Sequence, residues 1–311
     1  MRNEDKVTMD DIMTLRDKLA SGKFVVTGEL GPPRGCDAEA VRKKARMLKG
    51  AVDAVNITDN QTAIVRMSSL AASMICMSEG IEPVMQMTVR DRNRIALQSD
   101  LLGAAALGIK NVLCLSGDHQ SFGDQPGAKG VHDIDSIQLV YTARRLCEEK
   151  MILHSEKAFA VAPDLFIGAA CNPFAEPVDF RPVRLKMKIE AGAKFIQTQS
   201  IYDIPAFREF MKRIVDMGLH EKASIIAGVM PLKSAGMGTY LNEKVPGVVV
   251  PKHMIERIKG VPKERAADEG IEQCCEIINE IRGIEGVSGV HIMAIEWEHR
   301  VREIAERAGL I

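Results

Sequence analysis

The 311-residue chain is short of aromatic side chains and of net charge. Phe, Trp and Tyr together make up 4% of the residues, so few rings are available to stack on a planar ligand. The 41 basic and 42 acidic residues leave a net charge of -1, without the basic footprint of a nucleic-acid-binding protein. We therefore expect a small or locally recognised ligand and no nucleic acid.

The cysteines and the hydrophobic runs exclude further classes. The seven cysteines show neither a CxxC pair nor a Cys/His spacing suited to chelation, which predicts reduced thiols and no metal site. The N-terminus has no apolar signal core, and no run of about 18 apolar residues occurs that could span a bilayer. These absences predict a cytoplasmic protein without membrane insertion.

Strand-like and helix-like segments alternate along the chain. Eight apolar runs are predicted as strands, at 24–29, 53–58, 82–88, 111–116, 165–170, 194–199, 224–229 and 290–295. Amphipathic segments with helical spacing separate them, among them 38–49, 93–107, 134–150, 182–191 and 205–217. This order predicts an α/β protein, a closed (β/α)8 TIM barrel formed by residues 1–311 as one domain. An open doubly wound sheet is the alternative, but no GxGxxG follows the first strand.

An additional helix precedes the first strand. Thr8 and Asp11 have the spacing of a capping box, so a helix is predicted over 9–21, ended by Gly22. Residues 1–22 would thus form an N-terminal helix outside the repeating pattern.

The carboxyl ends of the predicted strands carry the polar residues. In a closed barrel these ends form the active site. Glu29 ends the run 24-FVVTGEL-30, just before a Gly-Pro-Pro turn. A carboxyl group in partly apolar surroundings has a raised pKa and can donate a proton near neutral pH, so Glu29 is a candidate general acid. A solvated loop glutamate is the alternative.

Asp118 follows the fourth strand and opens the glycine-rich segment 117–133, which is predicted to be a mobile loop over the barrel mouth. Two acidic groups that face one pocket can be held in different protonation states. Strands two to seven end in further hydrogen-bonding groups, which suits a large, polar, planar ligand.

Five motifs in this order resemble the methylenetetrahydrofolate reductase family over nearly the whole chain. They are 27-TGELGPPRG-35, 55-VNITDNQTAIVRMSS-69, 115-LSGD-118, 191-AGAKFIQTQ-199 and 228-GVMPLKSAGM-237. The resemblance implies a flavoprotein barrel that reduces 5,10-methylenetetrahydrofolate to 5-methyltetrahydrofolate. It implies that Glu29 protonates the leaving nitrogen of the folate ring and that Asp118 stabilises the iminium cation. Gln199 would bind the pterin, with Gln197 and Lys233 as further substrate-binding candidates.

The resemblance also implies a flavin site. FAD is the expected cofactor and FMN the alternative, with Lys188 facing the phosphate; a solvated helix face is the other interpretation of Lys188. The candidate cofactor-binding residues are Thr58, Gln86, Leu115, Ser116, Gly117, Asp118, Ala169, Ala170, Asn172 and Lys188.

The sequence departs from the family pattern at the residues around the flavin. Gln86 stands where many relatives have His, Ser116 where many have Arg, and 170-ACNP-173 lacks a flanking aromatic. The segment after strand seven lacks the Phe that packs against a pyridine nucleotide. The chain thus resembles variants of anaerobic bacteria in which a small zinc-containing partner subunit, part of an electron-transfer complex, supplies electrons instead of NADH. Two alternatives stay open: a pterin-dependent methyltransferase barrel without flavin, and a non-catalytic folate-binding subunit.

Overall fold

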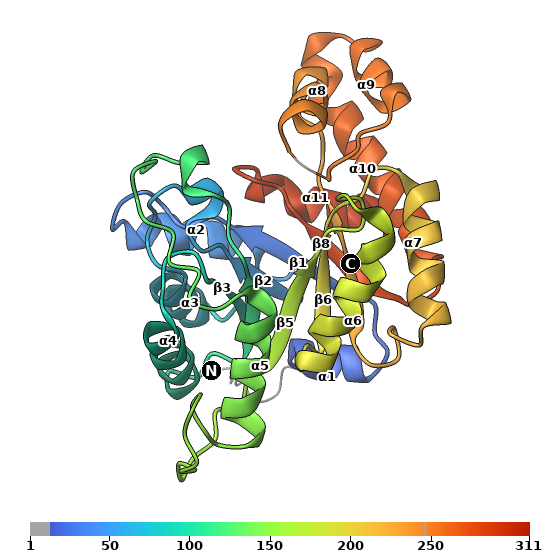
Figure 1. Cartoon of the computed structure of the whole chain (residues 1–311). Helices are drawn as coiled ribbons and strands as arrows, with labels where there is room; N and C mark the ends of the chain where they lie inside the picture. The colour runs from blue at the N-terminus through green and yellow to red at the C-terminus, as the bar shows by residue number, and fades with distance from the viewer. Residues whose placement is uncertain (1–12, 246) are drawn as a thin grey trace, which may run out of the picture.

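The computed structural model describes residues 13–245 and 247–311 and contains a closed parallel barrel in the order β1 to β8 (Figure 1). The strands are β1 (Val25–Leu30), β2 (Ala54–Ile57), β3 (Pro83–Thr88), β4 (Asn111–Leu115), β5 (Phe166–Cys171), β6 (Phe195–Ser200), β7 (Ser224–Val229) and β8 (Val287–Ile292). Pairing of β1 with β8, from Val25 opposite Gly289 to Gly28 opposite Ile292, closes the ring. The predicted (β/α)8 barrel is confirmed.

Helices surround this barrel. They are α1 (Leu15–Ala20), α2 (Ala38–Leu48), α3 (Ser69–Ser78), α4 (Arg94–Ala106), α5 (Ser136–Glu148), α6 (Arg181–Ala191), α7 (Ile204–Asp216), α8 (Ala235–Lys244), α9 (Lys252–Lys259), α10 (Ala266–Arg282) and α11 (Val301–Arg307). Helices α8 and α9 project from one end as a separate pair of helices (Figure 1). Among the described helices, none combines the length and the apolarity that a bilayer crossing requires.

Local sequence sets several of the helix starts. Asp37, Asn93 and Asp203 accept hydrogen bonds from the first free N–H groups of α2, α4 and α7, and Asp135 forms a capping box with Gln138 at α5. The strands are recognised differently. A parallel strand is covered on both faces, so its sequence is a nearly continuous apolar run.

Helix α1 closes the amino-terminal end of the barrel. Leu15 and Leu19 pack on an apolar layer inside the barrel, which comprises Val25, Ala54, Val84, Leu113, Phe166, Phe195 and Ile226. The backbone N–H of Leu15 donates to Glu82 Oε2 at 2.8 Å, and Lys18 Nζ lies 2.7 Å from Asp53 Oδ1. The barrel is therefore plugged at this end, and polar side chains fill it toward the other.

Leu15→Ala should destabilise the fold. Leu15 has no exposed surface, and its truncation leaves a cavity under the barrel. A loss of about 2–5 kcal/mol in the free energy of unfolding is expected, measured by urea denaturation. Leu107→Ala, at a half-exposed position of the same residue type, is the matched control and should change stability much less. Equal losses in the two variants would contradict the plug.

Two predicted elements differ from the structure by three residues or more at a boundary. Strand β8 begins at Val287 and ends at Ile292, three residues before the predicted 290–295, so Glu296 lies well beyond the strand. The described part of the N-terminal helix begins at Leu15, since Met13 and Thr14 are not helical. Thr14 and Asp17 form a capping box at this start. The predicted cap at Thr8 lies outside the described residues.

Candidate active site

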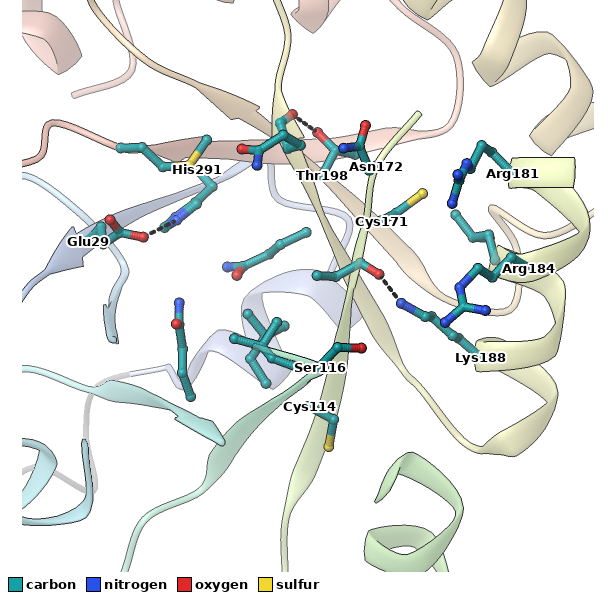
Figure 2. A pocket seen from close by; sticks show the side chains of 18 of the residues that line it. Glu29, Cys114, Ser116, Cys171, Asn172, Arg181, Arg184, Lys188, Thr198 and His291 are labelled. Carbon is teal, nitrogen blue, oxygen red and sulfur yellow. Dashed lines mark hydrogen bonds and ion pairs between the residues drawn. The ribbon is translucent and has the colours of Figure 1, made fainter. Parts of the chain in front are cut away.

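A cavity of about 350 Å³ opens at the carboxyl ends of the strands (Figure 2). Its lining residues are Glu29, Gln61, Gln86, Leu113, Cys114, Leu115, Ser116, Ala170, Cys171, Asn172, Arg181, Arg184, Leu185, Lys188, Gln197, Thr198, Gln199, His291 and Met293. None of these described lining residues is Phe, Tyr or Trp. The cavity therefore offers amides, aliphatic side chains and charges rather than stacking rings.

Glu29 is the one carboxylate among these lining residues, and two side chains orient it. Gln61 Nε2 donates to Glu29 Oε1 at 3.2 Å, and His291 Nε2 lies 3.7 Å from Glu29 Oε2. Glu29 is 7% exposed and His291 3% exposed. A carboxyl group thus faces the cavity with its direction fixed from both sides.

Beneath Glu29, a layer of polar side chains crosses the barrel interior. His291 Nδ1 lies 2.9 Å from Thr27 Oγ1, and Gln197 Nε2 lies 3.4 Å from the same oxygen. Gln197 and Asn56 exchange amide hydrogen bonds of 2.5 and 3.1 Å. Because all of these groups are buried and mutually satisfied, the layer is a rigid floor for Glu29.

Three cations lie at the opposite side of the cavity, on one face of α6. Arg181, Arg184 and Lys188 follow one another at helical spacing and point toward the end of β5 (Figure 2). Lys188 Nζ donates to the carbonyl of Ala170 at 2.5 Å, and Arg181 Nε donates to the carbonyl of Ala175 at 2.5 Å. Burial, reinforced by the nearby Arg184, lowers the pKa of Lys188. None of the described lining residues at this side is a carboxylate. This side of the cavity therefore suits an anionic group of a ligand.

Asp118 lies in a neighbouring hollow of about 210 Å³. This hollow shares Gln61, Gln86, Leu115 and Ser116 with the main cavity. Asp118 Oδ2 accepts the backbone N–H of Thr62 at 2.8 Å, and the adjoining residue Gln61 donates to Glu29. One short turn therefore connects the two carboxylates.

Most of the predicted site residues line these two spaces. Glu29, Gln86, Leu115, Ser116, Ala170, Asn172, Lys188, Gln197 and Gln199 line the main cavity, and Gly117 and Asp118 line the hollow. Three lie elsewhere. Thr58 is buried, with no partner for its Oγ1 among the described residues. Ala169 is buried in the main hydrophobic core, and Lys233 Nζ donates to the carbonyl of Ile295 at 2.6 Å beside Trp297.

Sequence reasoning missed several residues of the cavity, among them Gln61, Arg181, Arg184 and His291. His291 was hidden by the late boundary assigned to the eighth strand, and Gln61 stands in a turn beyond the second. Arg181 and Arg184 were indistinguishable from a solvated helix face. The sequence signal that could have found them is their spacing, which places both on the same helix face as Lys188.

Comparisons with known proteins agree with this architecture. Residues 14–309 match the family model described as methylenetetrahydrofolate reductase. A probable methylenetetrahydrofolate reductase (NADPH) of Caenorhabditis elegans is 24% identical over 81% of this chain, which spans 36% of that protein. A 5,10-methylenetetrahydrofolate reductase of Pectobacterium carotovorum subsp. carotovorum is 24% identical over 72% of the chain and 71% of its own length.

A solved structure supports the fold. An uncharacterized protein from Clostridium thermocellum, which binds two copies of 5-methyl-5,6,7,8-tetrahydrofolic acid, superposes with a TM-score of 0.66 over 95% of this chain and 98% of that one, at 14% identity. Since the family model covers nearly all of the sequence, the chain belongs to the methylenetetrahydrofolate reductase family.

Proposed function

We propose that this chain reduces 5,10-methylenetetrahydrofolate to 5-methyltetrahydrofolate with a flavin as hydride donor and Glu29 as general acid. The observation that carries the proposal is the position of Glu29, a buried carboxyl group that faces a polar cavity in a protein of this family. Gln61 and His291 fix its direction, so its proton can be aimed at the leaving nitrogen of the folate ring.

The residues at the α6 side of the cavity fit a flavin. A bound flavin, FAD or FMN, would supply the hydride that the methylene carbon accepts. Lys188 would hold the phosphate, since it lines the cavity and its ammonium group donates to the backbone carbonyl of Ala170, with no carboxylate bound to it among the described residues. Leu115, Ser116, Gly117 and Ala170 would contact the ring system and the ribityl chain from the ends of β4 and β5. Gln86 and Asn172 are further candidates on the cavity wall, and Thr58 and Ala169 would contribute from behind it.

Folate would bind between Glu29 and Asp118. Gln199 Oε1 accepts the N–H of Ser200 at 3.0 Å, so the amide nitrogen is the group that would donate to a pterin. The Asp118 carboxylate would stabilise positive charge on the folate iminium ion. Gln197, fixed by Asn56, would support the pterin from below, and Lys233 would act from the β7 side.

We further propose that electrons arrive through a partner rather than directly from NADH. The lack of Phe, Tyr and Trp among the described lining residues supports this, because the wall offers none of the three large aromatic side chains that could stack on a nicotinamide. A small zinc-containing subunit within an electron-transfer complex is the expected donor.

The purified chain should be yellow and should reduce methylenetetrahydrofolate with a reduced viologen dye, at a rate that NADH cannot support. Visible spectra and the dye-linked assay check this expectation. A colourless protein that takes up neither FAD nor FMN would exclude the flavin and favour a methyltransferase. A yellow protein inactive with either donor would favour a non-catalytic folate-binding subunit.

A further inference from the structure

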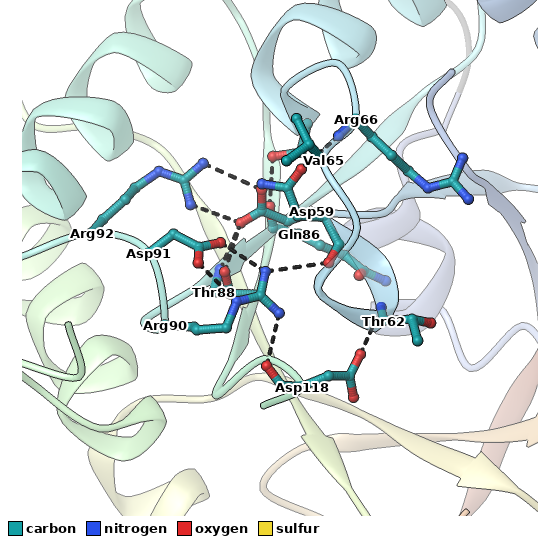
Figure 3. Close-up of polar contacts among 12 residues, drawn as sticks. Asp59, Thr62, Val65, Arg66, Gln86, Thr88, Arg90, Asp91, Arg92 and Asp118 are labelled. Atoms are coloured by element: carbon teal, nitrogen blue, oxygen red, sulfur yellow. Dashed lines mark hydrogen bonds and ion pairs between the residues drawn. The ribbon is translucent and has the colours of Figure 1, made fainter. Parts of the chain in front are cut away.

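Arg90 is a buried guanidinium group placed between two loops of the site (Figure 3). It follows β3 and is 2% exposed. Its Nη1 donates to the carbonyl of Asp118 at 2.9 Å, and its Nη2 donates to the carbonyl of Asn60 at 3.2 Å. The Asp91 carboxylate accepts hydrogen bonds from Arg90 Nε at 2.8 Å and from Arg90 Nη2 at 2.7 Å, which fixes the plane of the guanidinium group. One side chain therefore joins the loop after β2 to the loop after β4.

The loop after β2 needs such a support. Asn60, Thr62 and Ala63 have φ values of 48°, 58° and 56°, in the left-handed region that non-glycine residues seldom adopt. This conformation is unfavourable for Thr and Ala in particular, so the turn persists only where surrounding contacts hold it. The contact of Arg90 with the Asn60 carbonyl lies at its first strained residue.

The same turn presents its N–H group to the Asp118 carboxylate. Thr62 N–H donates to Asp118 Oδ2 at 2.8 Å (Figure 3). Arg90 thus acts on Asp118 in two ways, through the Asp118 carbonyl and through the turn that binds the carboxylate. Gly117, with φ of 84°, packs its backbone on Arg90 and Thr88, where an added Cβ would lie 3.2 and 3.1 Å from their Cβ atoms.

From this geometry we infer that Arg90 is a positioning residue, which sets the direction of the Asp118 carboxylate toward the substrate space. The inference rests on the proposed function for the role of Asp118. A lysine could not replace this arginine, because an ammonium group lacks the planar fork that reaches two carbonyl groups and a carboxylate at once.

Two nearby arginines offer a comparison. Arg92 pairs with the fully buried Asp59 and with Asp100. Arg94 pairs with Asp133 at the exposed start of α4. Neither donates to the Asn60 or Asp118 carbonyl in any described contact. Arg94 therefore offers a matched control, an arginine of the same connection that binds a carboxylate at the far end of the loop after β4 and, in the described contacts, touches neither Asn60 nor Asp118.

The test compares Arg90→Lys with Arg94→Lys in the full chain. The first readout is amide hydrogen exchange at Thr62, which needs no turnover; Arg90→Lys should speed it about tenfold. The second is single-turnover reoxidation of dye-reduced flavin by methylenetetrahydrofolate. A carboxylate displaced by about 1 Å should slow this step by about 10²-fold, with flavin binding and melting temperature retained. Arg94→Lys should leave both readouts within twofold of the original chain.

A double variant separates positioning from general damage. If Arg90 acts through Asp118, Arg90→Lys should slow the Asp118→Asn chain by no more than about threefold. A full additional loss, unchanged exchange at Thr62, or a rate loss that only follows loss of flavin would each overturn the inference. If the original chain never reoxidises with folate, the proposed reaction fails and the role of Asp118 fails with it, while the exchange result still reports whether Arg90 holds the turn.

Discussion

Glutamine in place of Glu29 should leave a folded, yellow protein that has lost about 10²-fold or more of its folate turnover. The amide fills the same space and can still meet Gln61 and His291, so the cavity keeps its shape. What it cannot do is donate an acidic proton to the folate nitrogen. Single-turnover reoxidation of reduced flavin by methylenetetrahydrofolate measures the loss, and dye-driven flavin reduction should proceed as before.

Glu296→Gln is the matched control for this result. Its side chain is 61% exposed and lies 3.4 Å from Lys44 Nζ, outside the cavity lining. We expect its turnover to equal that of the original chain. Glu29 would be excluded as the acid if its glutamine variant reoxidised at the normal rate. If the variant lost its flavin instead, Glu29 would have a binding role.

Lys188→Met should weaken flavin binding by about 10- to 100-fold without destabilising the apoprotein, since a hydrogen bond to a charged group contributes about 1.5–3 kcal/mol. Burial disfavours the ammonium form of Lys188 in the folded chain, and methionine removes that penalty. Fluorescence titration with FMN and FAD, combined with thermal melts, separates the two effects. Lys186→Met, at an exposed position of the same helix, should change neither.

The pH dependence follows from the same group. The pKa of Lys188 is lowered in the folded apoprotein, so the unfolded chain binds more protons, and the contribution of Lys188 to stability rises with pH up to the ordinary lysine range. Flavin affinity should run the other way and fall as the ammonium group loses its proton. This alkaline fall should be absent in Lys188→Met. An identical pH profile in both proteins would contradict the assignment of the phosphate to Lys188.

The barrel could be predicted because its signals are local. Apolar runs and amphipathic segments alternate along the chain, and they leave few alternatives for eight parallel strands. Strand β8 shows where this fails. Near its start, Ser288 and Gly289 carry little β propensity. Gly289 is required because a Cβ there would lie 2.3 Å from the Val25 carbonyl oxygen. That requirement comes from a partner strand far away in the sequence.

Some residues of the candidate site could be predicted from local sequence, and others could not. Glu29 and Asp118 were found because Glu29 lies at the carboxyl end of β1 and Asp118 lies three residues beyond the end of β4, where the fold brings both to the same rim. His291 was not found, because the eighth strand was predicted three residues too late. That prediction placed His291 at the start of the strand, whereas it lies at the carboxyl end. The left-handed turn at 60–63 was also hidden, since threonine and alanine rarely adopt that conformation and only contacts such as Arg90 with Asn60 hold it there.

Through Leu15 and Leu19, helix α1 covers the amino-terminal end of the described barrel. The described cavity opens at the opposite end, at the rim formed by the loops after the strands. Under the proposed reaction, folate and the electron donor would both approach the flavin through this rim, so they would have to bind one after the other.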